Sequence, residues 1–250
     1  MFSKEKKPQA KPASARENMR SFGLAILLAL FFRSFLFQPF HIPSGSMLGN
    51  LFIGDYLFVS KFAYGFSKHS LPFSPPLFSG RIFSSPVERG DVIVFRLPSD
   101  PNVSYIKRVI GLPGDKIQIV DGVIFLNNEP INLARTDDFT YKTEDGSIRR
   151  FPQFIETLPN GRAYKILDET SQGALDNTEN YIVPAGHYFC MGDNRDNSTD
   201  SRVLSKVGYI PEELIEGRAM RIGFSVSTPI WQIWNWPANI RSDRFWKAIE

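Results

Sequence analysis

The sequence lacks the residues on which most metal-binding and nucleotide-binding motifs depend. Its 250 residues include one cysteine, Cys190, which excludes an intrachain disulfide framework and a zinc site built from cysteines. Because Cys190 follows two aromatic residues, we expect a buried apolar side chain rather than a nucleophile. The three histidines, His41, His69 and His187, have neither a His-Glu-x-x-His nor a Cys/His metal spacing. No glycine-rich loop ends in Gly-Lys-Ser or Gly-Lys-Thr, so metal hydrolysis and nucleotide chemistry are both disfavoured.

Positive charge is concentrated near residue 1 rather than spread over the chain. The formal net charge is +3, and residues 1–20 hold six basic and two acidic side chains, which leaves about −1 for the remainder. Nucleic-acid-binding domains usually carry a basic face or a basic helix. The sequence therefore disfavours a nucleic-acid partner.

One long apolar segment follows this basic tail. Residues 22–37 read FGLAILLALFFRSFLF and are followed by Gln38 and Pro39. The segment is slightly short for a bilayer, which takes about 20 residues, but Arg33 near one end can extend its charge to the interface. A cleavable secretory signal is the alternative, yet no small-x-small site follows directly. We therefore expect an uncleaved transmembrane anchor over residues 21–38, with residues 1–20 as a cytoplasmic tail and residues 39–250 outside the cytoplasm.

Beyond residue 40 the apolar residues form short runs bounded by Gly, Pro, Asn or Asp, which is typical of strands. Helical periodicity is scarce, and residues 211–218 alone predict a short helix, with proline in its first turn. We expect a mainly β domain over residues 39–250, with an inserted β subdomain at about residues 126–185, where turn signals are frequent. The predicted strands are residues 56–59, 91–97, 105–110, 117–124 and 188–191.

Two apolar segments have no assigned element in that fold. Residues 65–86 are rich in Ser, Pro and Phe and predict a mobile apolar loop near lipid. All four tryptophans lie between residues 231 and 246, among basic residues. That composition suits a membrane interface and packing beneath the β core equally well.

The densest acidic cluster, residues 193–200 (DNRDNSTD), resembles a calcium loop at first sight. An EF-hand loop needs oxygen ligands at its first, third and fifth positions and glycine at its sixth. Arg195 falls at the third position here and Ser198 at the sixth. The calcium hypothesis therefore fails for this loop, and no metal is expected.

A serine in a short turn is the first candidate for catalysis. Ser46 lies in the segment Pro43-Ser44-Gly45-Ser46-Met47, where a tight turn after an extended segment would leave its hydroxyl accessible. By itself this signal is weak, because Ser-Gly-Ser is most often a linker.

A lysine on a predicted strand is the second candidate. Lys107 shares one strand face with Tyr105 and Val109, where burial would disfavour the charged amine and lower its pKa. The alternative places Lys107 on the outer face with its amine in water. A serine needs a base, and no histidine is a convincing partner, so a Ser46–Lys107 pair is the available solution.

Four segments in order resemble the motifs of the bacterial type I signal peptidases, also called leader peptidases. Residues 40–47 (FHIPSGSM) match the nucleophile motif, and residues 53–59 (IGDYLFV) with 61–65 (KFAYG) match the next, structural, motif. Residues 89–95 (RGDVIVF) lead into 105–115 (YIKRVIGLPGD), which match the lysine motif. Residues 192–202 (GDNRDNSTDSR) match the last.

The resemblance implies a membrane-anchored serine endopeptidase of the signal-peptidase β fold. It would use a Ser-Lys dyad without cofactor or metal and cleave signal peptides from exported preproteins after small residues at −3 and −1. It would lie in the bacterial cytoplasmic (inner) membrane as a single-pass protein with its catalytic domain on the outer, periplasmic, side. Its partners would be these signal peptides and membrane lipid.

The resemblance also assigns roles to individual residues. Ser46 would be the nucleophile and Lys107 the general base, while the Ser46 backbone amide and the Ser44 hydroxyl would form the oxyanion hole. Ser198 would orient the lysine amine. Supporting ion pairs would join Asp193 to Arg108 and Asp200 to Arg202. Substrate would contact Phe40, Ile42, Pro43, Met47, Leu51, Tyr105 and Ile106.

Two alternatives stay open on the sequence alone. A specialised relative that processes one dedicated substrate would carry the same four motifs. A non-enzymatic, membrane-tethered β-domain should have lost the serine or the lysine, and this chain keeps both.

Overall fold

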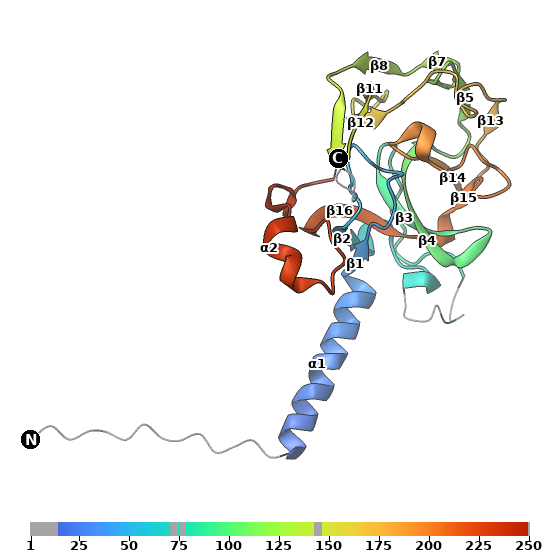
Figure 1. The fold of residues 1–250 in the computed structure, drawn as a ribbon. Coiled ribbons are helices and arrows are strands. Elements are labelled where there is room, and N and C mark those ends of the chain that lie inside the picture. Colours follow the sequence, from blue (N-terminus) through green and yellow to red (C-terminus); the bar gives the residue numbers. More distant parts are fainter. Residues whose placement is uncertain (1–14, 71–74, 76–78, 143–146, 250) are drawn as a thin grey trace, which may run out of the picture.

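The main body is built from antiparallel strands, as expected for a mainly β protein (Figure 1). The computed structural model describes residues 15–70, 75, 79–142 and 147–249, without the side chains of residues 31–35 and 142. Its largest sheet has seven strands in the order β1-β2-β16-β3-β4-β14-β15. These strands are β1 (Phe37–His41), β2 (Asp55–Ser60), β3 (Val92–Leu97), β4 (Asp100–Gly111), β14 (His187–Met191), β15 (Ile210–Pro211) and β16 (Ile215–Ser225).

Strand β3 explains why the sequence shows continuous apolar runs instead of simple alternation. Val92 and Val94 pack into one core cluster, whereas Ile93 and Phe95 pack into another on the opposite side. Successive side chains of a strand point to opposite faces, so a strand that is buried on both faces needs apolar residues at every position. The largest sheet is therefore covered on both faces at its centre.

Smaller sheets pack beside β4 and β14. The hairpin of β5 (Lys116–Val120) and β6 (Val123–Leu126) joins β13 (Tyr181–Ile182) and β7 (Glu129–Pro130) in a four-stranded sheet. A three-stranded sheet and a two-stranded sheet complete the region. Their strands are β8 (Asn132–Arg135), β11 (Gln153–Thr157) and β12 (Ala163–Leu167), and β9 (Phe139–Lys142) and β10 (Ile148–Phe151).

The expected inserted subdomain thus contains strands, but its sheets do not stop at residue 126. Strand β13, which lies inside the predicted insertion, pairs with β5, which precedes it. Residues 117–124 form two strands instead of one, because Asp121 and Gly122 take positive φ values of 48° and 79° and turn the chain between them.

The predicted helix at residues 211–218 is wrong. Glu212–Leu214 forms a single 3₁₀ turn, and β16 begins at Ile215. From Ile215 onward the chain pairs with β3 on one side and β2 on the other. Pairing on both edges and burial of Ile215 outweigh the local helical preference of the sequence Pro-Glu-Glu-Leu.

The first helix, α1 (Ala15–Phe35), extends away from the β body (Figure 1). The helix does not coincide with the predicted anchor at residues 21–38, because it begins in the expected tail and Phe37 and Gln38 already belong to β1. The anchor boundaries stay a prediction. Residues 15–30 are exposed, including Phe22, Leu27 and Met19. In the described part of the chain, no helix is long and apolar enough to cross a membrane. Residues 1–14 of the expected tail lie outside the described residues.

The C-terminal segment lies against β2 and β16, and its tryptophans are mostly not packed beneath the core. Trp231, Trp234 and Trp246 are exposed, and Trp236 contacts Phe224 with ring centroids 5.0 Å apart. This segment includes the short helix α2 (Trp236–Asn239) and the 3₁₀ turns Ile233–Asn235 and Ser242–Arg244. Other 3₁₀ turns are Phe62–Tyr64, Lys68–Ser70 and Arg195–Asn197. The expected apolar loop is described only in part, since residues 71–74 and 76–78 lie outside the described residues.

A buried ion pair attaches this C-terminal segment to the main sheet. The Arg244 guanidinium donates to both carboxylate oxygens of Asp55, at 3.1 and 2.6 Å, and lies 3.6 Å from the centroid of the Phe52 ring. Asp55 is fully buried and also accepts a hydrogen bond from the Ser225 hydroxyl at 2.6 Å. A single cation therefore compensates a carboxylate at the start of β2.

We expect Arg244→Met to lower the free energy of unfolding by about 3–5 kcal/mol, because it leaves the buried Asp55 carboxylate without a cation. Urea unfolding followed by tryptophan fluorescence measures the change. Arg221→Met is the matched control, since Arg221 is exposed and contacts the same C-terminal segment at Trp246. It should cost no more than about 1 kcal/mol. Equal losses for the two variants would contradict the proposed importance of the buried pair.

Candidate active site

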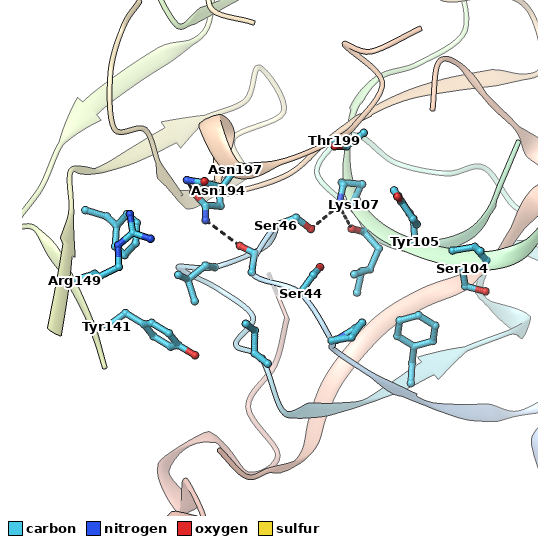
Figure 2. A pocket seen from close by; sticks show the side chains of 18 residues that line it. Ser44, Ser46, Ser104, Tyr105, Lys107, Tyr141, Arg149, Asn194, Asn197 and Thr199 are labelled. Carbon is cyan, nitrogen blue, oxygen red and sulfur yellow. Dashed lines mark hydrogen bonds between the residues drawn. The ribbon is translucent and has the colours of Figure 1, made fainter. Parts of the chain in front are cut away.

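An open groove of about 560 Å³ contains the predicted nucleophile and base (Figure 2). Four segments meet there: the turn after β1, strand β4, the β9–β10 hairpin and the loop after β14. The first two segments contribute Phe40, Pro43, Ser44, Gly45, Ser46, Leu48 and Ile53, and Val103, Ser104, Tyr105, Ile106 and Lys107. The last two contribute Tyr141, Arg149 and Phe151, and Asn194, Asn197 and Thr199.

The groove brings Ser46 and Lys107 into direct contact although 61 positions separate them in the sequence. Lys107 Nζ lies 2.6 Å from Ser46 Oγ and 3.0 Å from its other partner, the Ile106 carbonyl oxygen. Both side chains are buried. This is the geometry that a nucleophile and its base require.

Burial lowers the pKa of Lys107 from its ordinary 10.5 to about 8, because the charged amine loses its hydration. The carboxylates of Asp200 and Asp193 act in the opposite direction and raise it. Neither carboxylate forms an ion pair with Lys107. A substantial fraction of Lys107 is therefore neutral near pH 8 and able to accept a proton.

Two arginines bind the carboxylates that could otherwise form ion pairs with the protonated Lys107 amine. Arg108 donates to both oxygens of Asp193 at 2.8 Å, and Arg202 donates to both oxygens of Asp200 at 2.9 Å. Burial alone would raise the pKa of Asp200, but Arg202 and the Gly192 amide lower it below its usual value. The structure thus contains both ion pairs that the resemblance implied.

The serine turn is held by Asn194, which the sequence analysis did not single out as functional. The Asn194 amide N–H donates to the Ser46 carbonyl oxygen at 3.1 Å, and its side-chain nitrogen donates to the Gly45 carbonyl oxygen at 3.0 Å. Two hydrogen bonds thus hold the carbonyl groups of the two peptides that flank Ser46. Asn194 lies in the Gly-Asp-Asn-Arg motif at residues 192–195, which marked the segment as important. The motif does not show to which carbonyl group the asparagine donates its hydrogen bonds.

Ser44 and Ser198 lie on either side of this turn. Ser44 is exposed in the groove near Ser46 (Figure 2). Ser198 is buried beside the turn, since a Cβ on Gly192 would lie 2.2 Å from Ser198 Oγ and 2.6 Å from the Ser46 carbonyl oxygen. No hydrogen bond joins Ser198 to Lys107 in the described structure, so its expected role as the residue that orients the lysine stays a prediction.

The predicted substrate-binding residues divide into two groups. Phe40, Pro43, Tyr105 and Ile106 line the groove as expected. The other three do not line it, because their side chains are buried in the core cluster beneath it. These are Ile42, Met47 and Leu51.

A side of the groove that the sequence did not predict comes from β9 and β10. Tyr141, Arg149 and Phe151 line it there. Behind them, Arg195 binds Glu156 on β11 through two hydrogen bonds of 2.9 and 2.6 Å, with both side chains buried. This pair connects the smaller sheet to the loop after β14. Sequence reasoning missed it because the partners are 39 positions apart and Glu156 lies in no motif.

Cys190 is buried, as expected, and burial raises the pKa of its thiol well above the usual range. It is therefore unsuited to act as a nucleophile. His41 and His187 do not line the groove, and neither does His69.

We expect Asp200→Asn to lower the pKa of Lys107 below that of the unchanged protein, because Asp200 raises it and the Arg202 charge would remain. The same change should cost about 3–5 kcal/mol of stability, since it leaves a buried guanidinium without its carboxylate. Titration of ¹³C-labelled lysine side chains measures the pKa, with the exposed Asp137→Asn as the control that should leave it unchanged. A higher pKa in Asp200→Asn would contradict this account of the charges.

Comparisons with known proteins identify the family of this chain. A family model described as signal peptidase, peptidase S26, matches residues 15–224. Signal peptidase I of Rickettsia canadensis is 44% identical over 223 residues, which cover 86% of this chain and 82% of that protein. Signal peptidase I of Rickettsia typhi is 44% identical over 226 residues, which cover 87% and 83%.

Among solved structures, a signal peptidase I from Enterococcus faecalis matches with a TM-score of 0.31 and 23% identity, covering 54% of this chain and 97% of that one. The family match and the Rickettsia relatives extend over both Ser46 and Lys107. Together with the resemblance of the four motifs, they show that this chain belongs to the signal peptidase family, peptidase S26.

Proposed function

We propose that this chain is a serine endopeptidase that removes signal peptides from exported preproteins, with Ser46 as nucleophile and Lys107 as general base. The observation that carries the assignment of roles is the 2.6 Å contact between a buried lysine amine and the serine hydroxyl. Membership of the signal peptidase family supplies the substrate class.

In the first step, neutral Lys107 accepts the proton of Ser46 Oγ while the oxygen attacks the scissile carbonyl carbon. The protonated lysine then gives this proton to the leaving amine, and the acyl group stays on Ser46. In the second step, Lys107 takes a proton from water, whose oxygen attacks the ester carbonyl. The acyl–oxygen bond breaks, the acid leaves, and Lys107 returns the proton to Ser46 Oγ. Protein side chains and water complete the reaction, so the mechanism uses no cofactor.

The oxyanion that forms during attack needs hydrogen-bond donors. Among the described residues, no acceptor binds the Ser46 backbone N–H, so it is available to donate to the developing oxyanion. The Ser44 hydroxyl, exposed in the same groove, would be the second donor. Donors of this kind are commonly worth about 3–4 kcal/mol each in the transition state.

The substrate would bind in the groove as an extended strand. Strand β1 is at the edge of the seven-stranded sheet and pairs there with β2 alone. Such an edge can add a peptide strand through its backbone N–H and carbonyl groups. Phe40, Tyr105 and Ile106 offer apolar contacts, which suits small side chains at the −1 and −3 positions of the signal peptide.

Helix α1 would anchor the enzyme in the bacterial cytoplasmic membrane. Residues 15–30 of this helix are exposed, and they include large apolar side chains such as Phe22 and Leu27. With basic residues before the helix, the N-terminus would lie in the cytoplasm and the catalytic domain on the outer side. The exposed Trp231 and Trp234 suit the interface region of the bilayer. Shared anchoring would raise the effective concentration of enzyme and substrate.

The first test uses a purified precursor with an Ala-x-Ala site in detergent or lipid. Ser46→Ala should lower kcat by about 10⁴–10⁶-fold, because no other described hydroxyl is hydrogen-bonded to the Lys107 amine. Lys107→Met should lower it by at least about 10²–10⁴-fold, because Met keeps the packing of the stem but cannot accept a proton. Gel analysis of precursor and product measures both rates.

Thermal unfolding provides the control for both variants. Lys107→Met should unfold at an equal or higher temperature than the unchanged protein, since it removes an amine whose charge is disfavoured by burial. A folded Lys107→Met variant that keeps more than a few per cent of the rate would disprove the role of Lys107 as base. Precursor cleavage elsewhere than after Ala-x-Ala would disprove the proposed substrate class.

The pH dependence follows from the lowered pKa of Lys107. Only the neutral amine accepts a proton, so kcat/KM should rise about tenfold per pH unit below pH 8 and level off above it. Initial rates between about pH 6 and pH 10 measure this profile. A rate that is independent of pH in this range, or an optimum near pH 6, would contradict the assignment.

A further inference from the structure

Three carboxylates meet at a place that the proposed mechanism does not use. Asp168 follows β12, Asp176 ends the loop after it, and Asp196 lies in the 3₁₀ turn Arg195–Asn197. One oxygen of each carboxylate lies within 4.8 Å of the other two. Asp168 and Asp176 are buried, whereas Asp196 is exposed and leaves a route to solvent.

These carboxylates form no ion pair in the described structure, although the charge of Arg195 acts on Asp168 and Asp176 from nearby. None of the three forms an ion pair with a described lysine or arginine, and the guanidinium of the nearby Arg195 is bound to Glu156. Asp168 is only 8% exposed, and its Oδ1 accepts no hydrogen bond within the described residues. Burial, together with the charges of Asp176 and Asp196, raises the pKa of Asp168 to about 7. A buried acceptor surrounded by like charges requires a positive partner or a proton.

Two glycines leave space around the cluster. A Cβ on Gly173 would lie 2.6 Å from Asp196 Oδ1 and 3.0 Å from Asp176 Oδ2. A Cβ on Gly122 would lie 2.9 Å from Asp168 Oδ2. Any other side chain at these positions would therefore enter the space between or beside the carboxylates.

Other hydrogen bonds hold two of the carboxylates in place without using all their oxygens. Asp196 Oδ2 accepts from the Glu169 and Thr170 amides at 2.7 and 3.2 Å, and Asp176 Oδ2 accepts from the Gly173 amide at 2.6 Å. The Asp168 carboxyl group lies within hydrogen-bond reach of the Asp196 carboxylate, which contributes to the raised pKa of Asp168. The loop backbone thus orients the acidic side chains and leaves oxygens for a ligand.

We propose that Asp168, Asp176 and Asp196 bind a calcium ion that joins the loop 168–176 to the segment 193–200. Calcium takes oxygen ligands at about 2.3–2.6 Å, so two ligands on opposite sides of the ion are separated by up to about 5.2 Å. The three carboxylate oxygens lie within 4.8 Å of one another, which is compatible with ligands of one calcium ion. Magnesium requires about 2.0–2.1 Å and a near-ideal octahedral set, whereas calcium accepts flexible geometry. Water would complete the coordination on the exposed side.

This site is distinct from the calcium loop that the sequence excludes. That hypothesis required residues 193–200 to hold the ion by themselves, and Arg195 and Ser198 occupy two of the positions needed. Here the segment contributes Asp196 alone, and the other ligands come from 20 or more positions earlier in the chain. The ion would stabilise the segment that carries Asp193 and Asp200, which are paired with Arg108 and Arg202.

The test compares calcium with an ionic-strength control on the full chain in detergent, after removal of metals with EDTA. About 10 mM CaCl₂ should raise the unfolding temperature by about 3–6 °C relative to about 30 mM NaCl, for a Kd near 10⁻³ M. Isothermal titration with CaCl₂ should show one site with a Kd of about 10⁻⁴–10⁻³ M.

Two variants and one control make the result specific. Asp168→Asn should lose the calcium-dependent rise and, without calcium, should unfold at an equal or higher temperature than the unchanged protein, because one repulsive charge is gone. Gly173→Ala keeps all three carboxylates but fills the space between them, and it should weaken calcium binding at least about tenfold. Glu179→Gln removes an exposed charge from the same region and should leave the calcium response unchanged.

Three results would overturn the proposal. The first is an equal rise in NaCl and CaCl₂, which would be a general salt effect. The second is an unchanged calcium response in folded Asp168→Asn or Gly173→Ala. The third is a larger rise with MgCl₂ than with CaCl₂, which would remove the assignment to calcium. Precursor cleavage is not used in any arm, so the outcome is independent of the proposed peptidase activity.

Discussion

The active site depends on a lysine amine that is buried without a carboxylate partner. An ammonium ion in that position would need compensation, and the carboxylates of Asp193 and Asp200, which raise its pKa, are each bound by an arginine. The two carboxylates offset part of the cost of burying the Lys107 amine. They do not offset all of it, so the pKa of Lys107 stays below its ordinary value. Because both carboxylates are paired with arginines, they raise the pKa of Lys107 without forming an ion pair with it.

Strand β4 places two cations with opposite requirements at successive positions. Lys107 faces the groove and must lose its proton, whereas Arg108 is fully buried on the other side, where Asp193 binds it and the Tyr164 ring lies 3.9 Å away. The alternation of side chains along a strand separates them without any additional element. Exchanging the two residue types would remove both functions. Arginine at position 107 could not act as a base, and lysine at position 108 could not form the bidentate pair with Asp193.

Local sequence predicted what short segments determine. Strands β2, β3, β4 and β14, the Ser46 turn and the lysine on β4 follow from residues close in the chain, and the four motifs pointed to the proposed catalytic pair. Strands β1, β15 and β16 of the same sheet were not predicted. Contacts between residues that are far apart in the chain and belong to no shared motif could not be predicted. Examples are the Arg195–Glu156 pair and the cluster of carboxylates at positions 168, 176 and 196. The mistaken helix at residues 211–218 has the same origin, because pairing of β16 on both edges overrides a local preference.

The connection between α1 and β1 is one residue long, since the helix ends at Phe35 and the strand begins at Phe37. The Leu36 carbonyl oxygen between them accepts a hydrogen bond from the Lys61 amide at 3.1 Å. The helix thus leads into the edge strand of the groove through one residue, whose carbonyl group is hydrogen-bonded to the chain after β2. In a membrane-anchored enzyme, this short junction would set the distance of Ser46 from the membrane surface. The enzyme would then favour precursors whose cleavage site lies at the same distance from the lipid.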